Sequence, residues 1–224
     1  MRKAPVIGGG VAALLVLARK EFRNLGATPA ERRRPLPGDD VVPEAKGAST
    51  MAITIDVPPS AVWPWLVQMG CDRAGFYSWD RLDNGGRPSA TELHPAWQEL
   101  AVGDHVASTP TGDWWFEVVQ VEPERALVLR APVDVRAKKP FDPAGPRPRF
   151  FSDGVWAFVL EALPEGRTRL IVRVQGTARP RLLLGAANLL FWDPAHVVMQ
   201  SRQLRNLKRR AESLHREPVL VVAA

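Results

Sequence analysis

Three side chains in one short tract are the best candidates for acid–base chemistry. Tyr77, Trp79 and Asp80 lie within residues 71–90, a stretch rich in Gly and Asp. A carboxyl group buried beside aromatic rings has a raised pKa, and Asp80 would then orient a ligand hydroxyl or act as a general base. An Asp in such a tract more often caps a turn or pairs with an arginine such as Arg81 or Arg87. We favour this structural role.

The histidines add no recognisable catalytic spacing. His94 and His196 are the two of interest, because His105 fits a strand and His215 a solvated helix end. Neither has a partner in an HxxxH pattern, so no zinc site is predicted. His196 follows an Asp-Pro pair beginning at Asp193, which is ordinary chemistry for a helix start. A structural histidine is therefore favoured there as well.

Several enzyme classes are excluded by motif. The chain has no G-x-S-x-G elbow, and its run of three glycines, residues 8–10, lies in an apolar N-terminal stretch rather than in a phosphate loop. The single cysteine, Cys71, excludes an internal disulfide and makes a poor metal site. We predict no catalytic residue, no metal and no cofactor.

The elements that would position these side chains begin with a strand and a helix at residues 51–70. Val, Ile and Thr crowd the first half, and Pro58 and Pro59 stop the strand. Ser60 then caps a helix that carries Trp63 and Trp65. This layout favours the wall of a cavity over a catalytic loop.

Five more strands follow, at residues 104–108, 113–122, 126–132, 154–163 and 168–177, with turn residues between most of them. This is typical of an antiparallel meander. Residues 134–149 hold four prolines without periodicity, and a loop of this length is expected to be functional or disordered. Arg169 and Arg173 alternate with apolar residues in the last strand, so we expect both side chains to meet solvent.

Residues 195–216 place apolar side chains at helical spacing and predict a long amphipathic helix. The order of elements indicates an α+β helix-grip fold, in which a curved antiparallel sheet wraps around a long C-terminal α-helix and encloses an apolar cavity. Eight tryptophans stand against one tyrosine. Alternation puts Trp156 and Phe158 on one face of their strand, and we expect Trp156 and one of Trp114 and Trp115 to reach inward. Ordinary core packing is the alternative.

Four parts are predicted along the chain: an N-terminal apolar helix at 1–25, an extended linker at 26–48, the helix-grip domain at 49–216 and a tail at 217–224. The uncharged run at 4–18 is shorter than the roughly 20 residues that span a bilayer. An uncleaved anchor or an interfacial helix is preferred, with a helix docked on the domain as the alternative. A membrane-associated protein, otherwise cytoplasmic, is therefore expected.

The net charge of +6 does not indicate nucleic acid. Lys and Arg outnumber Asp and Glu by nine to five in residues 1–47 and by seven to three in residues 181–224, but number fourteen against sixteen between them. The basic excess at the two ends fits an anionic membrane surface at least as well. No nucleic-acid-binding motif is found, and no nucleic-acid partner is predicted.

The sequence also resembles a known superfamily. The segments AITIDVPPSAVWPWLVQMG, AGFYSWDRLDN, WQELAVGDHV, RALVLR, WAFVLE and TRLIVR are similar to SRPBCC proteins (START-like, polyketide cyclase/dehydrase-like), particularly uncharacterised bacterial members. The resemblance covers roughly residues 26–215. It implies the helix-grip fold but no shared catalytic set, and the absence of Cys/His pairs disfavours the Rieske oxygenase branch.

Three functions follow as hypotheses. The preferred one is binding of a small hydrophobic ligand, such as a lipid, isoprenoid or polyketide, in a central cavity. The second is a cyclase or dehydratase with Asp80, Tyr77 or His94 as acid or base, and the third is an interaction module that docks through the apolar residues 182–192. The candidate cavity residues are Trp63, Tyr77, Trp79, Asp80, His94, Trp97, Trp115, Trp156, Phe158 and His196.

Overall fold

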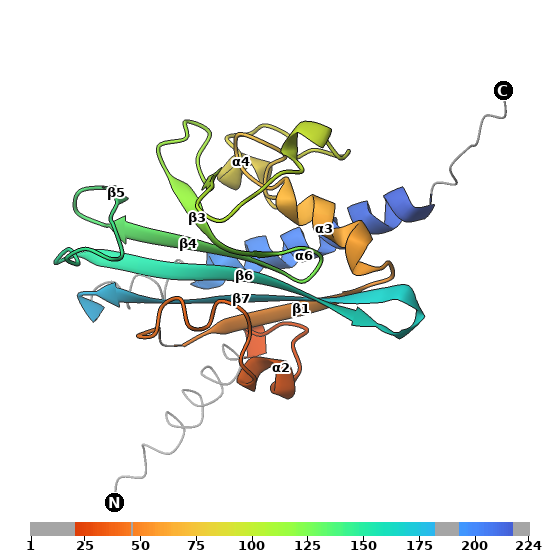
Figure 1. Cartoon of the computed structure of the whole chain (residues 1–224), viewed down its shortest axis with the longest axis horizontal. Coiled ribbons are helices and arrows are strands. Elements are labelled where there is room, and N and C mark those ends of the chain that lie inside the picture. The colour runs from red at the N-terminus through yellow and green to blue at the C-terminus, as the bar shows by residue number, and fades with distance from the viewer. Residues whose placement is uncertain (1–20, 46, 182–192, 217–224) are drawn as a thin grey trace, which may run out of the picture.

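The fold is built on one antiparallel sheet of seven strands (Figure 1). The computed structural model describes residues 21–45, 47–181 and 193–216. The strand order is β1-β7-β6-β4-β3-β2, and the short β5 pairs with β4. The strands are β1 (Ser49–Ile55), β2 (His105–Ala107), β3 (Trp115–Glu122), β4 (Ala126–Asp134), β5 (Lys139–Pro140), β6 (Phe151–Leu163) and β7 (Arg167–Arg179).

A long helix lies along one face of this sheet, which we call the inner face (Figure 1). The helices are α2 (Pro29–Arg33), α3 (Pro59–Val67), α4 (Asp80–Asp83) and α6 (Asp193–Arg216), with two 3-10 turns, η1 (Pro95–Trp97) and η2 (Pro164–Gly166). The predicted α+β helix-grip architecture is confirmed: a curved antiparallel sheet holds a long C-terminal helix.

Strand alternation separates two cores. On β6, Phe158 and Leu160 point to the inner face and pack with α3 and α6, while Val155 and Ala157 point to the outer face. All four are buried. Because a strand with only one covered face would alternate buried with exposed side chains, burial on both faces requires a cover on the outer side too.

That cover is the N-terminal segment, by which we mean residues 21–45. Its helix α2 begins with a capping box, in which Thr28 and Glu31 exchange hydrogen bonds between side chain and backbone. Leu36 packs on Ile171, and Val42 packs on Val128. The structure thus differs from the extended linker predicted at 26–48, and the folded unit begins well before Ser49. Its few buried side chains follow no period, so apolar patterning did not reveal it.

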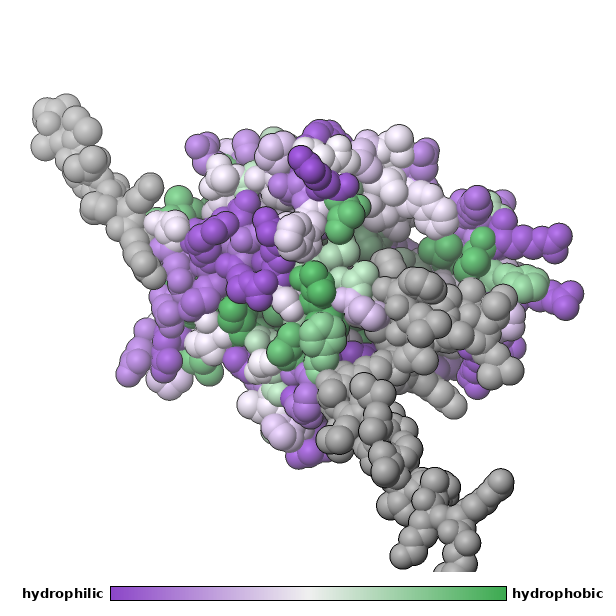
Figure 2. All heavy atoms as spheres, turned by 180° about the vertical axis from the view of Figure 1, so that it is seen from behind, coloured by the Kyte–Doolittle hydropathy of each residue, from purple (hydrophilic) through white to green (hydrophobic). Residues whose placement is uncertain are grey.

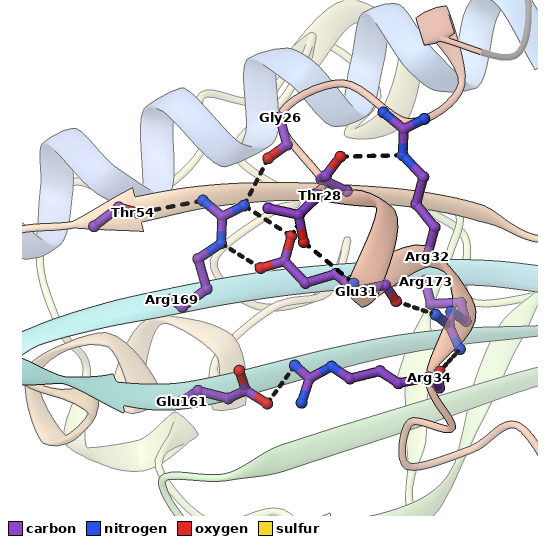
Figure 3. Close-up of polar contacts among 10 residues, drawn as sticks. Gly26, Thr28, Glu31, Arg32, Arg34, Thr54, Glu161, Arg169 and Arg173 are labelled. Carbon is purple, nitrogen blue, oxygen red and sulfur yellow. Dashed lines mark hydrogen bonds and ion pairs between the residues drawn. The ribbon is translucent and has the colours of Figure 1, made fainter.

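Two arginines of β7 fasten the N-terminal segment to the sheet (Figure 3). Arg169 donates from Nε to Glu31 Oε1 at 2.7 Å and from Nη2 to the Gly26 carbonyl at 2.6 Å. Arg173, which is 4% exposed, donates to Asp39 Oδ2 at 2.5 Å and to the Glu31 carbonyl at 2.6 Å. Both side chains lie on the outer face as alternation predicts, but the prediction that they meet solvent is wrong, because the N-terminal segment covers them.

The Glu31 carboxylate gives this attachment a pH dependence. Burial raises its pKa, but the hydrogen bonds from Arg169 and from the Thr28 backbone outweigh burial and bring the pKa from 4.5 down to about 2. The unfolded chain therefore takes up this proton at a higher pH than the folded chain does. We expect the free energy of unfolding to fall as the pH drops from about 4.5 toward 2, with the contribution of Glu31 complete above that range.

Urea unfolding of the wild type and of Glu31→Gln, from pH 7 down to pH 2.5, measures this effect. The gap between the two proteins should be widest at neutral pH and should narrow in the acid range. A gap that stays constant with pH would mean that the Glu31 charge does not stabilise the fold.

The predicted N-terminal helix falls mostly outside the described residues, as do the apolar stretch 182–192 and the tail 217–224. Among the residues that are described, no helix combines the length and the apolar character that crossing a bilayer requires. Membrane attachment through residues 1–25 stays a prediction.

Candidate ligand-binding site

An aromatic cluster lies on the inner face, with Trp156 at its centre. The Trp156 ring lies 4.8 Å from that of Phe158, 5.5 Å from that of Phe116 and 5.8 Å from that of Phe76, measured between ring centroids. Phe76 and Phe158 are buried, whereas Trp156 and Phe116 are only half-buried. Two large apolar side chains of the inner face thus keep accessible surface, which is the surface that an apolar ligand would cover.

Two glutamines of α6 hold the cluster from the helix side. Trp156 Nε1 donates to Gln200 Oε1 at 3.0 Å, and Gln200 Nε2 donates to Gln203 Oε1 at 2.6 Å. Gln203 Nε2 then donates to the carbonyl of Phe76 at 3.0 Å. Both glutamines are almost fully buried. Because each buried amide has partners, this series of hydrogen bonds fixes the position of the Trp156 indole against α6.

Beside Trp156 the inner face carries only glycine and alanine on three neighbouring strands. Strand register aligns Ala131 of β4 with Gly154 of β6, and Gly154 with Gly176 of β7. All three lie in phase with the inward residues Leu129, Trp156 and Val174 of the same strands. We call these three residues the glycine floor. Three neighbouring strands therefore present almost bare backbone next to the aromatic cluster.

Few atoms of the described residues lie near the position that a Gly154 side chain would take. A Cβ built on Gly154 would have one described neighbour within 4 Å, the Gln175 carbonyl at 3.7 Å, which is backbone of the next strand. Gly176 differs, because its Cβ would stand 2.6 Å from the Asp153 carbonyl. Gly176 is thus needed for close approach of two strands, whereas at Gly154 no side chain of the described residues comes within 4 Å of the Cβ position.

The face that carries α6 is shown in Figure 2. Hydrophobic residues gather in the middle of this face beside a hydrophilic region, and part of the view is occupied by residues that the structure does not describe. Contiguous apolar surface of this kind is a feature of ligand and partner sites in general.

Tyr77 is not available to a ligand. It is 0% exposed, its hydroxyl donates to the Trp65 carbonyl at 3.1 Å, and the same oxygen accepts from Gln68 Nε2 at 3.0 Å. Burial raises the pKa of the phenol, which keeps it neutral. Asn206 of α6 donates to the Tyr77 carbonyl at 2.7 Å. Tyr77 is therefore a link between the polar tract, α3 and the last helix.

Trp79 and Asp80 also contact other residues of the protein. Trp79 is 42% exposed and lies under the Arg202 guanidinium, whose Cζ is 4.0 Å from the ring centroid. Asp80 Oδ1 accepts from the Ser89 backbone at 3.1 Å and from its hydroxyl at 2.5 Å. The carboxylate thus holds a turn, in the structural role that the sequence favoured, and does not meet Tyr77 to form an acid–base pair.

The remaining predicted residues divide between the edge of the core and other surfaces. The rings of His94 and Trp97 are in tilted contact, with centroids 4.3 Å apart, and Trp97 and Trp63 pack against the margin of the inner core. Trp115 lies on the outer face, where it stacks on His105 at 4.7 Å. His196 is half-buried near the start of α6. Of the ten predicted residues, Trp156 and Phe158 lie in the aromatic cluster.

Cys71 has no catalytic setting. Its buried thiol donates to the Asp83 carbonyl at 2.8 Å, and burial is the main cause that raises its pKa to about 11. A thiol with this pKa is protonated at neutral pH and is a poor nucleophile. Within the described parts of the chain, no three His, Cys, Asp or Glu side chains gather in a way that could hold a metal ion.

Sequence reasoning missed Phe76, Phe116, Gln200, Gln203 and the glycine floor. A signal for the floor was present, because Gly154 and Gly176 stand two residues from Trp156 and Val174 and so share their face. Phe116 stands two residues after Trp114, so period-two alternation places both on one face of their strand. No local signal marked Phe76, which reaches the cluster through the loop after α3.

Comparison with known proteins adds little beyond the architecture. No family model and no curated protein matches the sequence. Solved structures do match, among them MLL2253 from Mesorhizobium loti, at 20% identity and a TM-score of 0.38 over 73% of this chain and 97% of that one. CalU16 from Micromonospora echinospora matches at 15% identity and a TM-score of 0.32, over 74% and 84% of the two chains. DynU16 of the dynemicin biosynthetic locus matches at 16% identity and a TM-score of 0.41, over 73% of this chain and 48% of that one. With scores this low, function must be argued from the residues.

Proposed function

We propose that this protein binds one small hydrophobic molecule on the inner face of its sheet, above the glycine floor and against Trp156 and Phe116. We propose further that it is a helix-grip protein of the SRPBCC type. The observation that carries the ligand proposal is the row of Ala131, Gly154 and Gly176 beside a half-buried tryptophan. Bare backbone next to half-buried aromatic rings would give a ligand both room and apolar contact area.

The chemistry of the surroundings favours an apolar ligand. The Trp156 indole N–H and the Gln200 and Gln203 amides satisfy one another, so the cluster offers little unmet hydrogen bonding. Affinity would then come mainly from buried apolar area, at about 25 cal/mol per Å2 before the costs of association. A flat or branched hydrocarbon body suits a bare strand floor better than a sugar or a nucleotide does.

The contacts do not favour the cyclase or dehydratase alternative. Such a reaction needs an acid and a base that converge on the ligand. The Tyr77 hydroxyl is committed to Trp65 and Gln68, and the Asp80 carboxylate to Ser89. The His94 ring contacts that of Trp97, and its backbone N–H donates to Gln68 Oε1 just after α3. These three side chains therefore have structural partners rather than a shared substrate position.

The proposal is tested on the full chain, purified from a bacterial host and extracted with organic solvent for mass spectrometry. A co-purified apolar compound near one molecule per chain is expected, together with saturable binding of the neutral dye N-phenyl-1-naphthylamine to the extracted protein. If extracts contain no such compound and the refolded, extracted protein does not bind the dye, the proposed function is wrong.

A further inference from the structure

A pocket at the end of the sheet, apart from the proposed apolar site, is lined by arginines. It has a volume of about 800 Å3 and lies where β6 begins and β7 ends. Three separate segments form it, and its lining residues are Glu44, Arg147, Pro148, Arg149, Phe150, Phe151, Arg179, Pro180 and Arg181. Nothing in the proposed apolar site explains why four guanidinium groups border one hollow.

The charges of this pocket are poorly balanced. Arg147 forms an ion pair with Glu44 at 2.8 Å, and Glu44 is the only carboxylate among the described residues that line the pocket. Among the described residues, no carboxylate lies within ion-pairing distance of Arg149, Arg179 or Arg181. Like charges brought together repel one another, and an anion placed among them removes this repulsion.

The walls are partly apolar, and the four arginines among them are exposed. Phe151 is 1% exposed, packs edge-on against Phe141 at 5.8 Å and carries the Arg147 guanidinium 5.6 Å above its ring. The Arg149 guanidinium lies at the same distance over Phe150. Phe151 is also paired with Arg179 in the sheet, which fixes the backbone of that arginine. Two guanidinium groups thus lie over rings, and the backbone of a third arginine is fixed at a strand end.

We infer that this pocket binds an oxyanion carried by a small apolar body, such as an organic phosphate. Guanidinium groups form paired hydrogen bonds with phosphate or carboxylate oxygens, and the phenylalanine and proline walls accept the apolar part. The volume is within the range of pockets that hold small organic ligands. The same chemistry is presented by a free organic phosphate and by the headgroup of an anionic lipid.

The test uses the full chain and two double variants that remove equal charge. Arg179→Gln with Arg181→Gln alters the pocket, and Arg205→Gln with Arg209→Gln alters the side of α6, away from it. Calorimetric titration with phenyl phosphate and with inorganic phosphate measures affinity. Flotation with phosphatidylcholine vesicles, with and without phosphatidic acid, then distinguishes a lipid headgroup from a free ligand.

Phenyl phosphate is expected to bind the wild type more tightly than inorganic phosphate, and the pocket variant to lose about tenfold or more in affinity, while the control changes less than about twofold. Flotation that needs phosphatidic acid and is lost in the pocket variant alone would identify a lipid headgroup as the source of the oxyanion. Equal loss in both variants, or no binding of any probe, overturns the inference. The inference is independent of the glycine floor, since Gly154→Leu should leave phenyl phosphate binding unchanged.

Discussion

Arg173→Ala is expected to lower the free energy of unfolding by roughly 3 to 5 kcal/mol, the usual cost of removing one partner from a buried ion pair. The guanidinium donates to the Asp39 carboxylate, to Thr50 Oγ1 at 3.1 Å and to two main-chain carbonyls, those of Glu31 and Arg34. Without it the Asp39 carboxylate keeps, among the described residues, only the Leu36 N–H on the same oxygen, and the two carbonyls lose the Arg173 donor beneath the N-terminal segment. Urea unfolding at neutral pH, followed by tryptophan fluorescence, measures the loss.

The matched control is Arg167→Ala on the same strand. Arg167 pairs with Glu165 at 3.5 Å, but the Arg167 side chain is 40% exposed and that of Glu165 81%, and an exposed pair contributes at most about 1 kcal/mol. Equal losses in the two variants would show that residues 21–45 do not stabilise the sheet through Arg173. Removal of residues 1–47 would uncover Ala52, Val159 and Ile171 on the outer face, so binding studies need the full chain.

Gly154→Leu is expected to weaken binding of N-phenyl-1-naphthylamine by at least about tenfold, which corresponds to about 1.4 kcal/mol. The added side chain would occupy the room above the glycine floor that we assign to the ligand. The backbone of Gly154 is ordinary extended strand and its Cβ has space, so the fold should tolerate the change. A dye titration monitored by emission intensity gives the affinity, and thermal unfolding checks that stability is kept.

Ala144→Leu controls for the added apolar surface. Ala144 is exposed on the loop between β5 and β6, so leucine there adds the same side chain away from the floor. Its dye affinity should match that of the wild type. If Gly154→Leu folds normally and binds the dye as tightly as Ala144→Leu does, the floor is not the binding surface.

Strand alternation explains how much of the sheet could be predicted. The inward set on β6, which includes Trp156 and Phe158, follows from period two alone, because a strand covered on one face by a helix must turn every second residue toward it. On β3 the same rule groups Phe116 with Val118 correctly. The register then shifts between Val118 and Gln120. Val121 packs against the inner core, although simple alternation from Phe116 and Val118 would place it on the outer face.

The N-terminal segment could not be predicted from local pattern. Glu31 and Arg169 are 138 residues apart, and the ion pair between them exists only because the segment crosses β7. Nothing near Arg169 or Arg173 in the sequence distinguishes a buried arginine from a solvated one. Long-range partners, rather than neighbours in the chain, decide the burial of such a side chain.

The same limit applies to the candidate site. The tract that holds Tyr77, Trp79 and Asp80 has the composition of an active-site loop, but its polar groups are used to hold the loop itself. Tyr77 even has a left-handed backbone, at a φ of 58°, which a bulky residue adopts only when its surroundings fix it. Composition identified the tract, but only the partners of each atom separate a structural network from a catalytic one.

Intermolecular nuclear Overhauser effects between N-phenyl-1-naphthylamine and the labelled full-length protein test the central claim most directly. We predict cross-peaks from the dye to the indole N–H of Trp156 and to the backbone amides of Gly154 and Gly176, at one dye molecule per chain. Cross-peaks confined to other residues, with Trp156 and the glycine floor unaffected at saturation, would contradict it.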